Sequence, residues 1–461
     1  MPTIRRMRGF LASSIGVTCA AALALPLALP SADARAATPA APPAVPPAAE
    51  GIPGSTQSLP LAPLASDRSS GPNEREQGLA RRDVRPFALV GVVWDDPTDE
   101  LRGTVQVRTR ASGTTTWSGW QSVETHNHEH AADPETLERG TGKVRGATAP
   151  LWVGDSDGVE VRVRAEFERH GDHNRTGALL PEGLRLELVD PGDEPPPLGS
   201  QTEVPRLTPG MTVEPEAASA VNADLAPMDA AAIPELTKQQ TEDELLAARG
   251  GPEVAGQARP YIGPRPRIIT RKGWGADERI REKDFAYTQT VKAAFVHHSA
   301  SGNNYRCSQA GSVLRSIYRY HVKSSGWRDF GYNFAIDKCG NIYEGRAGGV
   351  AKPVLGAHTL GFNANSTGIA VLGTYSSANP PKAAVTAIAR LAAWKLGLHG
   401  ADPEGTTHLK SGGGNLYKKG TNVRLRVISG HRDGYATECP GKQLYAKLGT
   451  ARSSAARYQG R

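Results

Sequence analysis

The chain has 461 residues, of which 38% are hydrophobic and 22% are charged, and its formal net charge is +7 at pH 7. This length is sufficient for two domains joined by linkers. The positive charge suits an anionic partner, but no basic run is interleaved with aromatic residues, so we exclude a nucleic-acid-binding protein.

Residues 1–36 are predicted to be an export signal. A basic start precedes an apolar run, and small residues near its end allow cleavage after Ala36. A membrane anchor is the alternative, but Pro26 and Pro30 interrupt the run. We therefore expect a secreted bacterial protein without a stable membrane anchor after cleavage. The sequence leaves open whether export uses the Sec or the twin-arginine route.

Residues 37–80 are rich in Ala, Pro and Ser and are predicted to form a disordered spacer. A small all-β, sandwich-like domain is predicted over residues 81–195, beginning with the apolar stretch RPFALVGVVWDD. Hydrophobic and polar residues then alternate in GTVQVRTR, GVEVRVRAEFE and LRLELV, which is typical of half-buried strands.

Two features of this β domain allow both a functional and a structural interpretation. Trp117 and Trp120 are able to stack on sugar rings, but we favour packing in the core. His126, His128 and His130 occur in THNHEHAAD, where alternate side chains of a strand would converge on a metal. Because this stretch lacks the apolar residues of a strand, we favour a solvated loop.

Residues 196–262 are again rich in Pro, Ala and acidic residues and are predicted to be a linker. Within this linker, PELTKQQTEDELLAARG is predicted to form one amphipathic helix. An α/β domain is predicted over residues 263–450, followed by a C-terminal tail, 451–461.

The C-terminal domain mixes predicted strands and helices. VKAAFVHHSA is predicted to be a buried strand that ends in histidines, SVLRSIYRYHV a helix, and GYNFAIDKCGNIYEGR two strands around a turn. TGIAVLGTY is another predicted strand, KAAVTAIARLAAWKLGL a helix, and NVRLRVISGHRD a final strand. Interspersed in this way, they indicate a mixed central sheet flanked by helices.

Removal of the export signal leaves three cysteines, Cys307, Cys339 and Cys439. Disulfides are expected outside the cell, but three thiols cannot all pair. One of them is therefore free, intermolecular or bound to a metal. If Cys439 binds a metal, Cys307 and Cys339 are left to form a disulfide.

A metal site is one interpretation of the histidines of this domain. His297 and His298 end a predicted strand, and His431 lies in the same loop as Cys439. Two imidazoles and a thiolate make the three protein ligands of a catalytic zinc site, whose fourth position is open to water. The alternatives are surface histidines and a buried cysteine that acts as a small hydrophobic residue. The residues alone leave both interpretations open.

Four segments of the domain occur in the same order as in a known family. VHHSA, GWRDFGYNFAIDKCGNIYEGR, GAHTLGFNANSTGIAVLGTY and GHRDGYATECPG resemble motifs of peptidoglycan recognition proteins, which belong to the zinc-dependent N-acetylmuramoyl-L-alanine amidases (amidase type 2). The resemblance covers about residues 265–450 and does not extend to the N-terminal domain. The overall arrangement resembles exported actinobacterial members.

The resemblance implies a site with Zn²⁺ as its cofactor. The implied metal ligands are His297, His431 and Cys439, and the implied catalytic residues are Tyr332 and Thr437. The family carries either a lysine or a threonine at the position of Thr437, so the contribution of this residue is left open. Tyr332 has an ordinary strand aromatic as its alternative interpretation.

Nearby polar residues are expected to hold the glycan and the stem peptide. By resemblance, this substrate-binding set is His298, His321, Trp327, Arg346, His358, Thr359 and Asn363. The planar fork of Arg346 suits a stem-peptide carboxylate, with a structural salt bridge as the alternative. His321 lies on the apolar stripe of its predicted helix, so a core position is its alternative.

Together, these features predict a secreted, cell-wall-associated zinc amidase that binds peptidoglycan as its partner and is a monomer. The expected reaction hydrolyses the amide between N-acetylmuramic acid and the L-alanine of the stem peptide. One alternative is a module that binds wall fragments without cutting them, and another is a structural wall protein targeted through its β domain. The presence of Cys439 favours the enzyme, since recognition-only members of the family have usually lost this cysteine.

Overall fold

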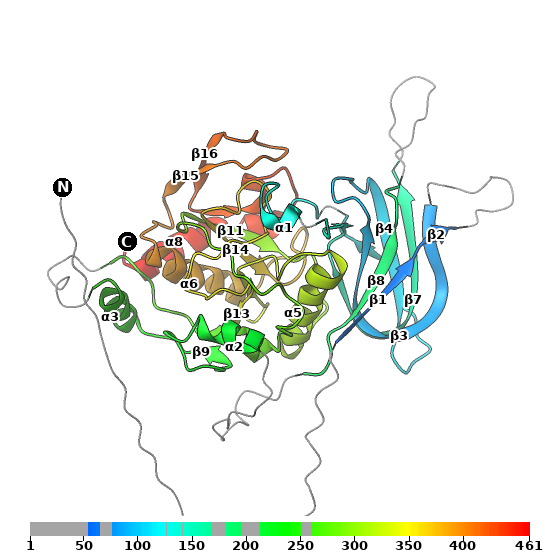
Figure 1. Ribbon diagram of the computed structural model, residues 1–461, viewed down its shortest axis with the longest axis horizontal. Coiled ribbons are helices and arrows are strands. Elements are labelled where there is room, and N and C mark those ends of the chain that lie inside the picture. The colour runs from blue at the N-terminus through cyan, green and yellow to red at the C-terminus, as the bar shows by residue number, and fades with distance from the viewer. Residues whose placement is uncertain are drawn as a thin grey trace, which may run out of the picture. The chain divides into compact units, whose positions relative to one another are not determined.

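Figure 1 shows the computed structural model, in which a strand-rich region precedes a region of mixed strands and helices. The structure describes residues 54–64, 76–125, 127–140, 142–166, 180–194, 213–250 and 260–461. The predicted export signal, residues 1–36, lies outside the described residues. Residues 51–461 form one compact unit.

The N-terminal region is the all-β domain that the alternating pattern predicts. Its sheet has the strand order β1-β8-β3-β7-β4-β5, and β2 and β6 each pair with β3. Each of these pairings is antiparallel. The strands are β1 (Ser55–Pro60), β2 (Ala62–Pro63), β3 (Glu76–Trp94), β4 (Gly103–Ala111), β5 (Gln121–Val123), β6 (Gly146–Ala147), β7 (Leu151–Ala165) and β8 (Arg185–Asp190).

Alternation along the strands separates a core face from a solvated face. In β7, Val159, Val161 and Val163 are buried, whereas Glu160 and Arg162 between them are partly exposed. The buried valines pack in one cluster with apolar residues of β3, β4 and β8. Apolar burial, worth about 25 cal/mol per Å², is thus concentrated on one side of each strand.

The β domain begins earlier than the sequence predicts. β1 and β2 lie within residues 37–80, so the structure corrects the prediction of a disordered spacer there. All six residues of β1 pair with β8, and Gln57 is the buried residue of this strand. An edge strand held by its backbone hydrogen bonds has no apolar periodicity for the sequence to display.

The C-terminal region is built on a mixed sheet with the order β17-β11-β14-β12-β13-β10-β9. The four strands from β17 to β12 are parallel to one another, whereas β13 is antiparallel to β12 and β9 to β10. The predicted strand NVRLRVISGHRD is divided in the structure. Its first part is β16, which forms a separate antiparallel pair with β15, its middle part is β17, and its last three residues, His431–Asp433, form the helical turn η4. The strands are β9 (Ala232–Ile233), β10 (Ile268–Ile269), β11 (Ala293–His298), β12 (Phe334–Ile336), β13 (Ile342–Glu344), β14 (Ser366–Val371), β15 (Thr406–Lys410), β16 (Asn422–Arg426) and β17 (Ile428–Gly430).

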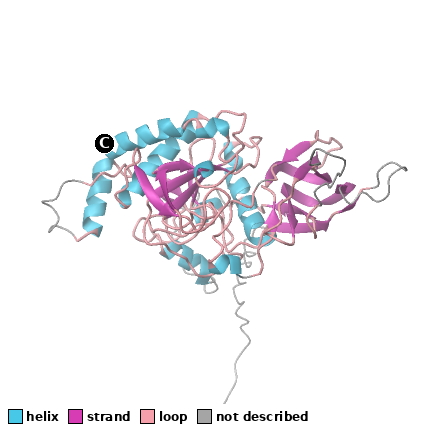
Figure 2. Ribbon diagram, turned by 90° about the horizontal axis from the view of Figure 1, so that it is seen from above, coloured by secondary structure: helices cyan, strands magenta, loops and turns pink. Residues whose placement is uncertain are grey.

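Helices cover both faces of this sheet, as predicted. Apolar residues of α6 and α8 pack with Val296 and Ile369 on one face, and residues of α5 pack with Ala335 and Ala370 on the other. Figure 2 shows the helices around the strands of this domain and a β domain made of strands and loops. The helices and helical turns are α1 (Leu137–Gly140), α2 (Val213–Ala220), α3 (Lys238–Ala248), α4 (Arg271–Trp274), η2 (Cys307–Gln309), α5 (Ala310–Arg319), η3 (Tyr320–Ser324), α6 (Lys382–Leu398), η4 (His431–Asp433), α7 (Lys442–Tyr445) and α8 (Leu448–Gln459).

The C-terminal domain also takes up parts of the predicted linker and tail. The helix predicted within residues 196–262 is present as α3, whose N-cap Thr237 forms a capping box with Gln240. From the same stretch, β9 adds an edge strand to β10, so the structure corrects the linker prediction for these residues. The predicted tail, 451–461, is mostly helix α8, whose small buried residues pack against α6.

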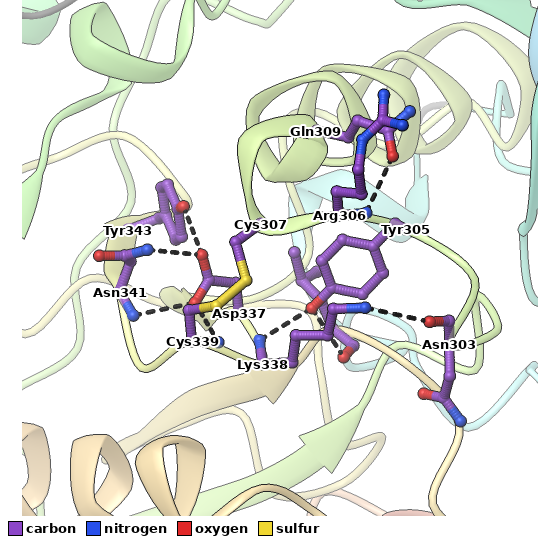
Figure 3. Close-up of a disulfide and its surroundings, with 11 residues drawn as sticks. Asn303, Tyr305, Arg306, Cys307, Gln309, Asp337, Lys338, Cys339, Asn341 and Tyr343 are labelled. Carbon is purple, nitrogen blue, oxygen red and sulfur yellow. Dashed lines mark hydrogen bonds between the residues drawn. A yellow bond between two sulfur atoms is a disulfide. The ribbon is translucent and has the colours of Figure 1, made fainter.

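A disulfide joins Cys307 to Cys339, which lies in the turn between β12 and β13. Figure 3 shows the carboxylate of Asp337 in this turn, where it accepts hydrogen bonds from the Cys339 amide at 2.9 Å and from the Tyr343 hydroxyl at 2.8 Å. The bond is the one left for these two cysteines if Cys439 binds a metal. Within the described residues, Cys439 is free and buried.

Candidate metal centre and substrate groove

The register of two parallel strands places His297 beside His431. In the pairing of β11 with β17, Val296 lies opposite Gly430, so the two histidines that follow them are at the same level. Side chains at one level of adjacent strands point to the same face. The two rings are 4.6 Å apart between centroids, and both residues are fully buried.

Cys439 reaches these histidines from the loop after η4. Its Sγ lies 3.7 Å from Nδ1 of His297. The Arg432 amide donates a hydrogen bond to the Cys439 carbonyl at 3.0 Å, and the Cys439 amide donates one to Oγ1 of Thr437 at 3.1 Å. The three residues predicted as metal ligands therefore lie together in the structure.

A fourth side chain, His130 of the N-terminal domain, completes the group. Its Nε2 lies 3.2 Å from Nδ1 of His431, and its ring centroid is 5.3 Å from that of His297. One ligand atom from each of His130, His297, His431 and Cys439 lies within 4.8 Å of the others, and all four residues are buried. The prediction of a solvated loop at THNHEHAAD is therefore wrong for His130.

This set of side chains suits zinc. Zn²⁺ accepts imidazole nitrogen and thiolate sulfur, usually four ligands in tetrahedral geometry. Bonds of about 2.0–2.1 Å to nitrogen and about 2.3 Å to sulfur place neighbouring ligand atoms roughly 3.3–3.6 Å apart. The His130–His431 distance of 3.2 Å and the His297–Cys439 distance of 3.7 Å are close to this spacing.

Burial determines the charge of these groups. It lowers the pKa values of His297 and His431 well below the ordinary imidazole value, and the neighbouring imidazoles lower them further. Burial also lowers the pKa of His130 to about 4. It raises the pKa of the Cys439 thiol well above its ordinary value, so a thiolate at this position requires a cation beside it. The group therefore offers neutral imidazoles and a thiol that a metal ion can deprotonate.

The two predicted catalytic residues lie next to this group. The ring of Tyr332 is 5.2 Å from that of His297 and 5.9 Å from that of His130. Burial raises the pKa of the Tyr332 hydroxyl well above its ordinary value, so the hydroxyl remains protonated. Oγ1 of Thr437 donates a hydrogen bond to Oε1 of Glu129 at 2.6 Å.

Part of the predicted substrate-binding set is packed around the predicted metal ligands. His358 Nδ1 lies 3.3 Å from Nε2 of His297 and 2.9 Å from Oγ1 of Thr359. Asn363 fixes this turn, because its Oδ1 accepts hydrogen bonds from the amides of His358 and Thr359 at 2.7 and 3.0 Å. All three predicted residues are fully buried. They therefore support the orientation of His297.

His321 and Trp327 form a stacked pair, with ring centroids 4.4 Å apart and planes 24° apart. The His321 Nδ1 accepts a hydrogen bond from the Gly331 amide at 3.3 Å. Both aromatic residues are buried, which agrees with the core position that was the alternative for His321.

The structure corrects the prediction that His298 lines the site. Successive residues of a strand point to opposite faces, so His298 turns away from the face of His297. Its Nδ1 accepts a hydrogen bond from the Tyr375 amide at 3.2 Å. Tyr375 belongs to the core cluster beneath α6.

Arg346 binds a carboxylate that belongs to the chain itself. Its two terminal nitrogens lie 2.8 and 2.9 Å from the two carboxylate oxygens of Glu138 in α1, and its Nε donates to the Phe330 carbonyl at 2.8 Å. Burial alone would raise the pKa of Glu138, but the charge and hydrogen bonds of Arg346 hold it below its ordinary value. The pair is the structural salt bridge that was the alternative for Arg346, and in it Glu138 occupies the carboxylate-binding side of the guanidinium.

The other features singled out in the β domain differ from their predictions. Nε2 of His128 lies 2.9 Å from the Tyr435 hydroxyl, so His128 does not join the metal group; His126 lies outside the described residues. Trp117 and Trp120 are half-buried and not in the core. Arginine guanidinium groups cover both rings, and the distance from Arg162 to the centroid of Trp120 is 4.1 Å.

Sequence reasoning missed the contribution of the N-terminal domain to the site. The relevant residues are Glu129, His130, Asp133 and Glu138, all of which contact the C-terminal domain. The repeated histidines of THNHEHAAD were a signal for His130, but the carboxylates had no sequence motif. A cavity of about 260 Å³ lies elsewhere, lined by residues that include Asn222, Arg271 and Glu344.

The fold and the site together define a two-domain protein, with an all-β domain and an α/β domain that contains a buried His/Cys group suited to zinc. Two family models match these regions. Residues 43–183 match "Rv3811 N-terminal galactose-binding domain-like", and residues 287–442 match "N-acetylmuramoyl-L-alanine amidase". The N-terminal domain is therefore galactose-binding-like.

Among similar proteins, peptidoglycan-recognition protein SC2 of Drosophila simulans is 30% identical over 185 residues, which are 40% of this chain and 85% of that protein. Human N-acetylmuramoyl-L-alanine amidase is 30% identical over 193 residues, 40% of this chain and 28% of that protein. The chain belongs to the family of peptidoglycan-recognition proteins and N-acetylmuramoyl-L-alanine amidases.

Two solved structures are also similar. Drosophila PGRP-LB is 28% identical and covers 40% of this chain and 92% of its own, with a TM-score of 0.32. Peptidoglycan recognition protein-LE, solved in complex with tracheal cytotoxin, is 27% identical and covers 40% of this chain and 92% of its own, also with a TM-score of 0.32.

Proposed function

We propose that the chain is a zinc-dependent N-acetylmuramoyl-L-alanine amidase that binds peptidoglycan and hydrolyses the amide between N-acetylmuramic acid and the stem peptide. The observation that carries this proposal is the convergence of His297, His431 and Cys439, with the hydroxyl-bearing Tyr332 beside them. Family membership supports the same reaction and the same substrate.

Each side chain of the site has a separate role in the proposed amide hydrolysis. Zinc held by His297, His431 and Cys439 would lower the pKa of a water toward about 7 and polarise the scissile carbonyl. Tyr332, protonated at neutral pH because it is buried, donates a hydrogen bond to the oxygen on which negative charge develops. Thr437 positions the Cys439 loop through the hydrogen bond that it accepts from the Cys439 amide.

Arg346 supplies the substrate contact with the clearest chemistry. Its guanidinium binds a carboxylate through two hydrogen bonds, as the pair with Glu138 demonstrates. A free carboxylate of the stem peptide is the corresponding group in peptidoglycan. This assignment requires Glu138 to leave.

We also propose that residues 1–36 direct export and that the mature monomer acts at the cell wall. The supporting feature is the pattern of a basic start, an apolar run and a small-residue cleavage site. Within the part of the chain that the structure describes, no helix has the length and apolarity needed to cross a membrane.

The alternative function is peptidoglycan binding without hydrolysis. It is favoured by the number of protein side chains around the site, since four protein ligands are typical of structural zinc and three of catalytic zinc.

Purified peptidoglycan is incubated with the protein, and released stem peptides are identified by mass spectrometry. Because Glu138 must leave Arg346, the parent is compared with Glu138→Ala. We expect release by this variant that stops with a chelator and with the further substitution Cys439→Ala; binding to the wall by both proteins without any release would contradict hydrolysis.

A further inference from the structure

Residues 127–140 belong to the N-terminal domain by their place in the chain, but their side chains bind residues of the C-terminal domain. This segment follows β5 and precedes β6, so both neighbouring strands belong to the N-terminal sheet. Its helix α1 contacts the C-terminal domain, because the Arg328 amide and the Arg346 side chain donate hydrogen bonds to Glu138. We call residues 127–140 the plug segment, because its contacts reach the metal group, the catalytic loop and the carboxylate-binding arginine.

At the metal group, the plug segment contributes His130. A catalytic zinc site leaves one of four positions open to water, whereas a fourth protein ligand closes it. Nε2 of His130 is 3.2 Å from Nδ1 of His431 and belongs to the buried four-residue group. His130 would thus supply a fourth protein ligand to an ion that His297, His431 and Cys439 hold.

In the catalytic loop, the plug segment binds Thr437. The carboxylate of Glu129 accepts a hydrogen bond from the Thr437 hydroxyl at 2.6 Å, and Glu129 is 1% exposed. The backbone carbonyl of Glu129 accepts a hydrogen bond from the Leu360 amide at 2.9 Å. Glu129 therefore binds both Thr437, in the Cys439 loop, and Leu360, next to Thr359.

Between these points and α1, the plug segment binds the turn that supports His297. Oδ1 of Asp133 accepts hydrogen bonds from the Gly361 amide at 2.6 Å and from Nδ2 of Asn363 at 2.9 Å. Nδ2 of Asn363 also donates to the Ala131 carbonyl at 2.9 Å. These polar groups belong to the region predicted to hold the substrate.

Near its C-terminal end, the plug segment contributes Glu138, which forms an ion pair with Arg346. Both side chains are 6% exposed, and the Arg328 amide donates a further hydrogen bond to Oε1 of Glu138 at 3.2 Å. Arg346 is therefore unable to bind a second carboxylate while the segment is docked.

We propose that the plug segment is an autoinhibitory element, which holds the amidase latent by placing His130 in the open metal position and Glu138 in the carboxylate site. This inference rests on the proposed function. Because the contacts are non-covalent, displacement of the segment activates the enzyme. The docked segment is thus a substrate competitor carried on the same chain.

The first test measures occupancy of the metal position in the full chain loaded with Co²⁺. We expect His130→Ala to alter the visible ligand-field absorption and to weaken Co²⁺ binding by about tenfold or more, because a water replaces an imidazole. Leu137→Ala is the matched control, since this side chain of the same segment is 84% exposed. Identical spectra and affinities for the parent protein and His130→Ala would overturn the proposal.

The second test measures docking and latency with Glu138→Ala, a variant that leaves the metal group intact. We expect hydrogen exchange in residues 127–140 to rise by about tenfold or more, and stem-peptide release to increase relative to the parent and to Leu137→Ala. Unchanged exchange together with unchanged release would contradict autoinhibition and leave the amidase assignment standing. Faster exchange in a metal-loaded variant that never releases peptide would support the docked segment and contradict the proposed hydrolase.

Discussion

Nε2 of His130 lies 3.2 Å from Nδ1 of His431, although the two residues are 301 positions apart and belong to different domains. Two buried imidazole nitrogens at this distance share either a proton or a cation. The thiol of Cys439 and the ring of His297 complete the same group, which favours the cation. The group of four side chains is therefore a contact between the domains as well as a candidate metal site.

The first prediction concerns metal content. The parent protein is expected to hold one zinc per chain after dialysis, and Cys439→Ser is expected to hold much less, because a hydroxyl does not replace a thiolate as a zinc ligand. Bound zinc at a hundredfold excess over its dissociation constant stabilises the folded chain by about 2.7 kcal/mol. Elemental analysis and thermal unfolding with and without a chelator measure both effects. Equal zinc content in the two proteins would remove Cys439 from the ligand set.

Tyr332→Phe is expected to separate catalysis from structure. The substitution keeps the ring that packs beside His297 and removes the hydroxyl assigned to the developing oxyanion. Loss of one such donor lowers kcat by about 10²–10³-fold, while zinc content and the thermal midpoint are expected to stay near those of the parent. Steady-state kinetics on soluble muropeptides gives the comparison. A variant with parent-like kcat would return Tyr332 to its alternative role as a strand aromatic.

The C-terminal ligands were predictable from the family motifs, because the residues alone left both a metal site and its alternatives open. The apolar stretch VKAAFVHHSA predicts the buried strand β11, and in the structure its register with β17 brings His297 beside His431. His298 shows the limit of this reasoning, since the motif includes it but strand alternation turns it away. Motif membership alone does not specify the direction of a side chain.

The N-terminal half of the site was not predictable from local patterns. His130 and Glu138 are buried only by contacts with residues far along the chain, and their surroundings in the sequence are polar, as in a solvated loop. β1 was missed for a related reason, because it is held by backbone pairing with β8 along its whole length and Leu59 is its one leucine packed against the core. In both the 127–140 segment and β1, contacts with distant residues determine the structure, and the local composition does not predict it.

The disulfide is expected to stabilise the C-terminal domain without acting on the metal. Cys307 and Cys339 are 32 positions apart, and a cross-link over a loop of this length stabilises a fold by about 3–4 kcal/mol in the chain-entropy model. The double variant Cys307→Ser, Cys339→Ser is expected to unfold at a lower urea concentration with unchanged zinc content. Loss of zinc in this variant at temperatures where it remains folded would show that the bond also supports the metal centre.

Glu344 is expected to make stability depend on pH near neutrality. Burial raises its pKa to about 7, although Asn222 and the Arg271 side chain and amide partly oppose the shift and Glu278 adds to it. The folded protein therefore binds a proton at Glu344 that the unfolded chain has lost above its ordinary pKa. The resulting stabilisation is complete below the ordinary pKa and is lost as the pH rises through 7.

Glu344→Gln removes this titration and keeps an oxygen that can accept from Nδ2 of Asn222, which lies 2.8 Å from Oε1 in the parent. Between pH 5 and pH 8, the free energy of unfolding of the parent is expected to fall by about 2–3 kcal/mol more than that of the variant. Urea unfolding at the two pH values measures the difference, and the comparison cancels the other titrating groups that both proteins share. Parallel pH profiles would mean that Glu344 remains ionised in the folded state, stabilised by the buried guanidinium of Arg271.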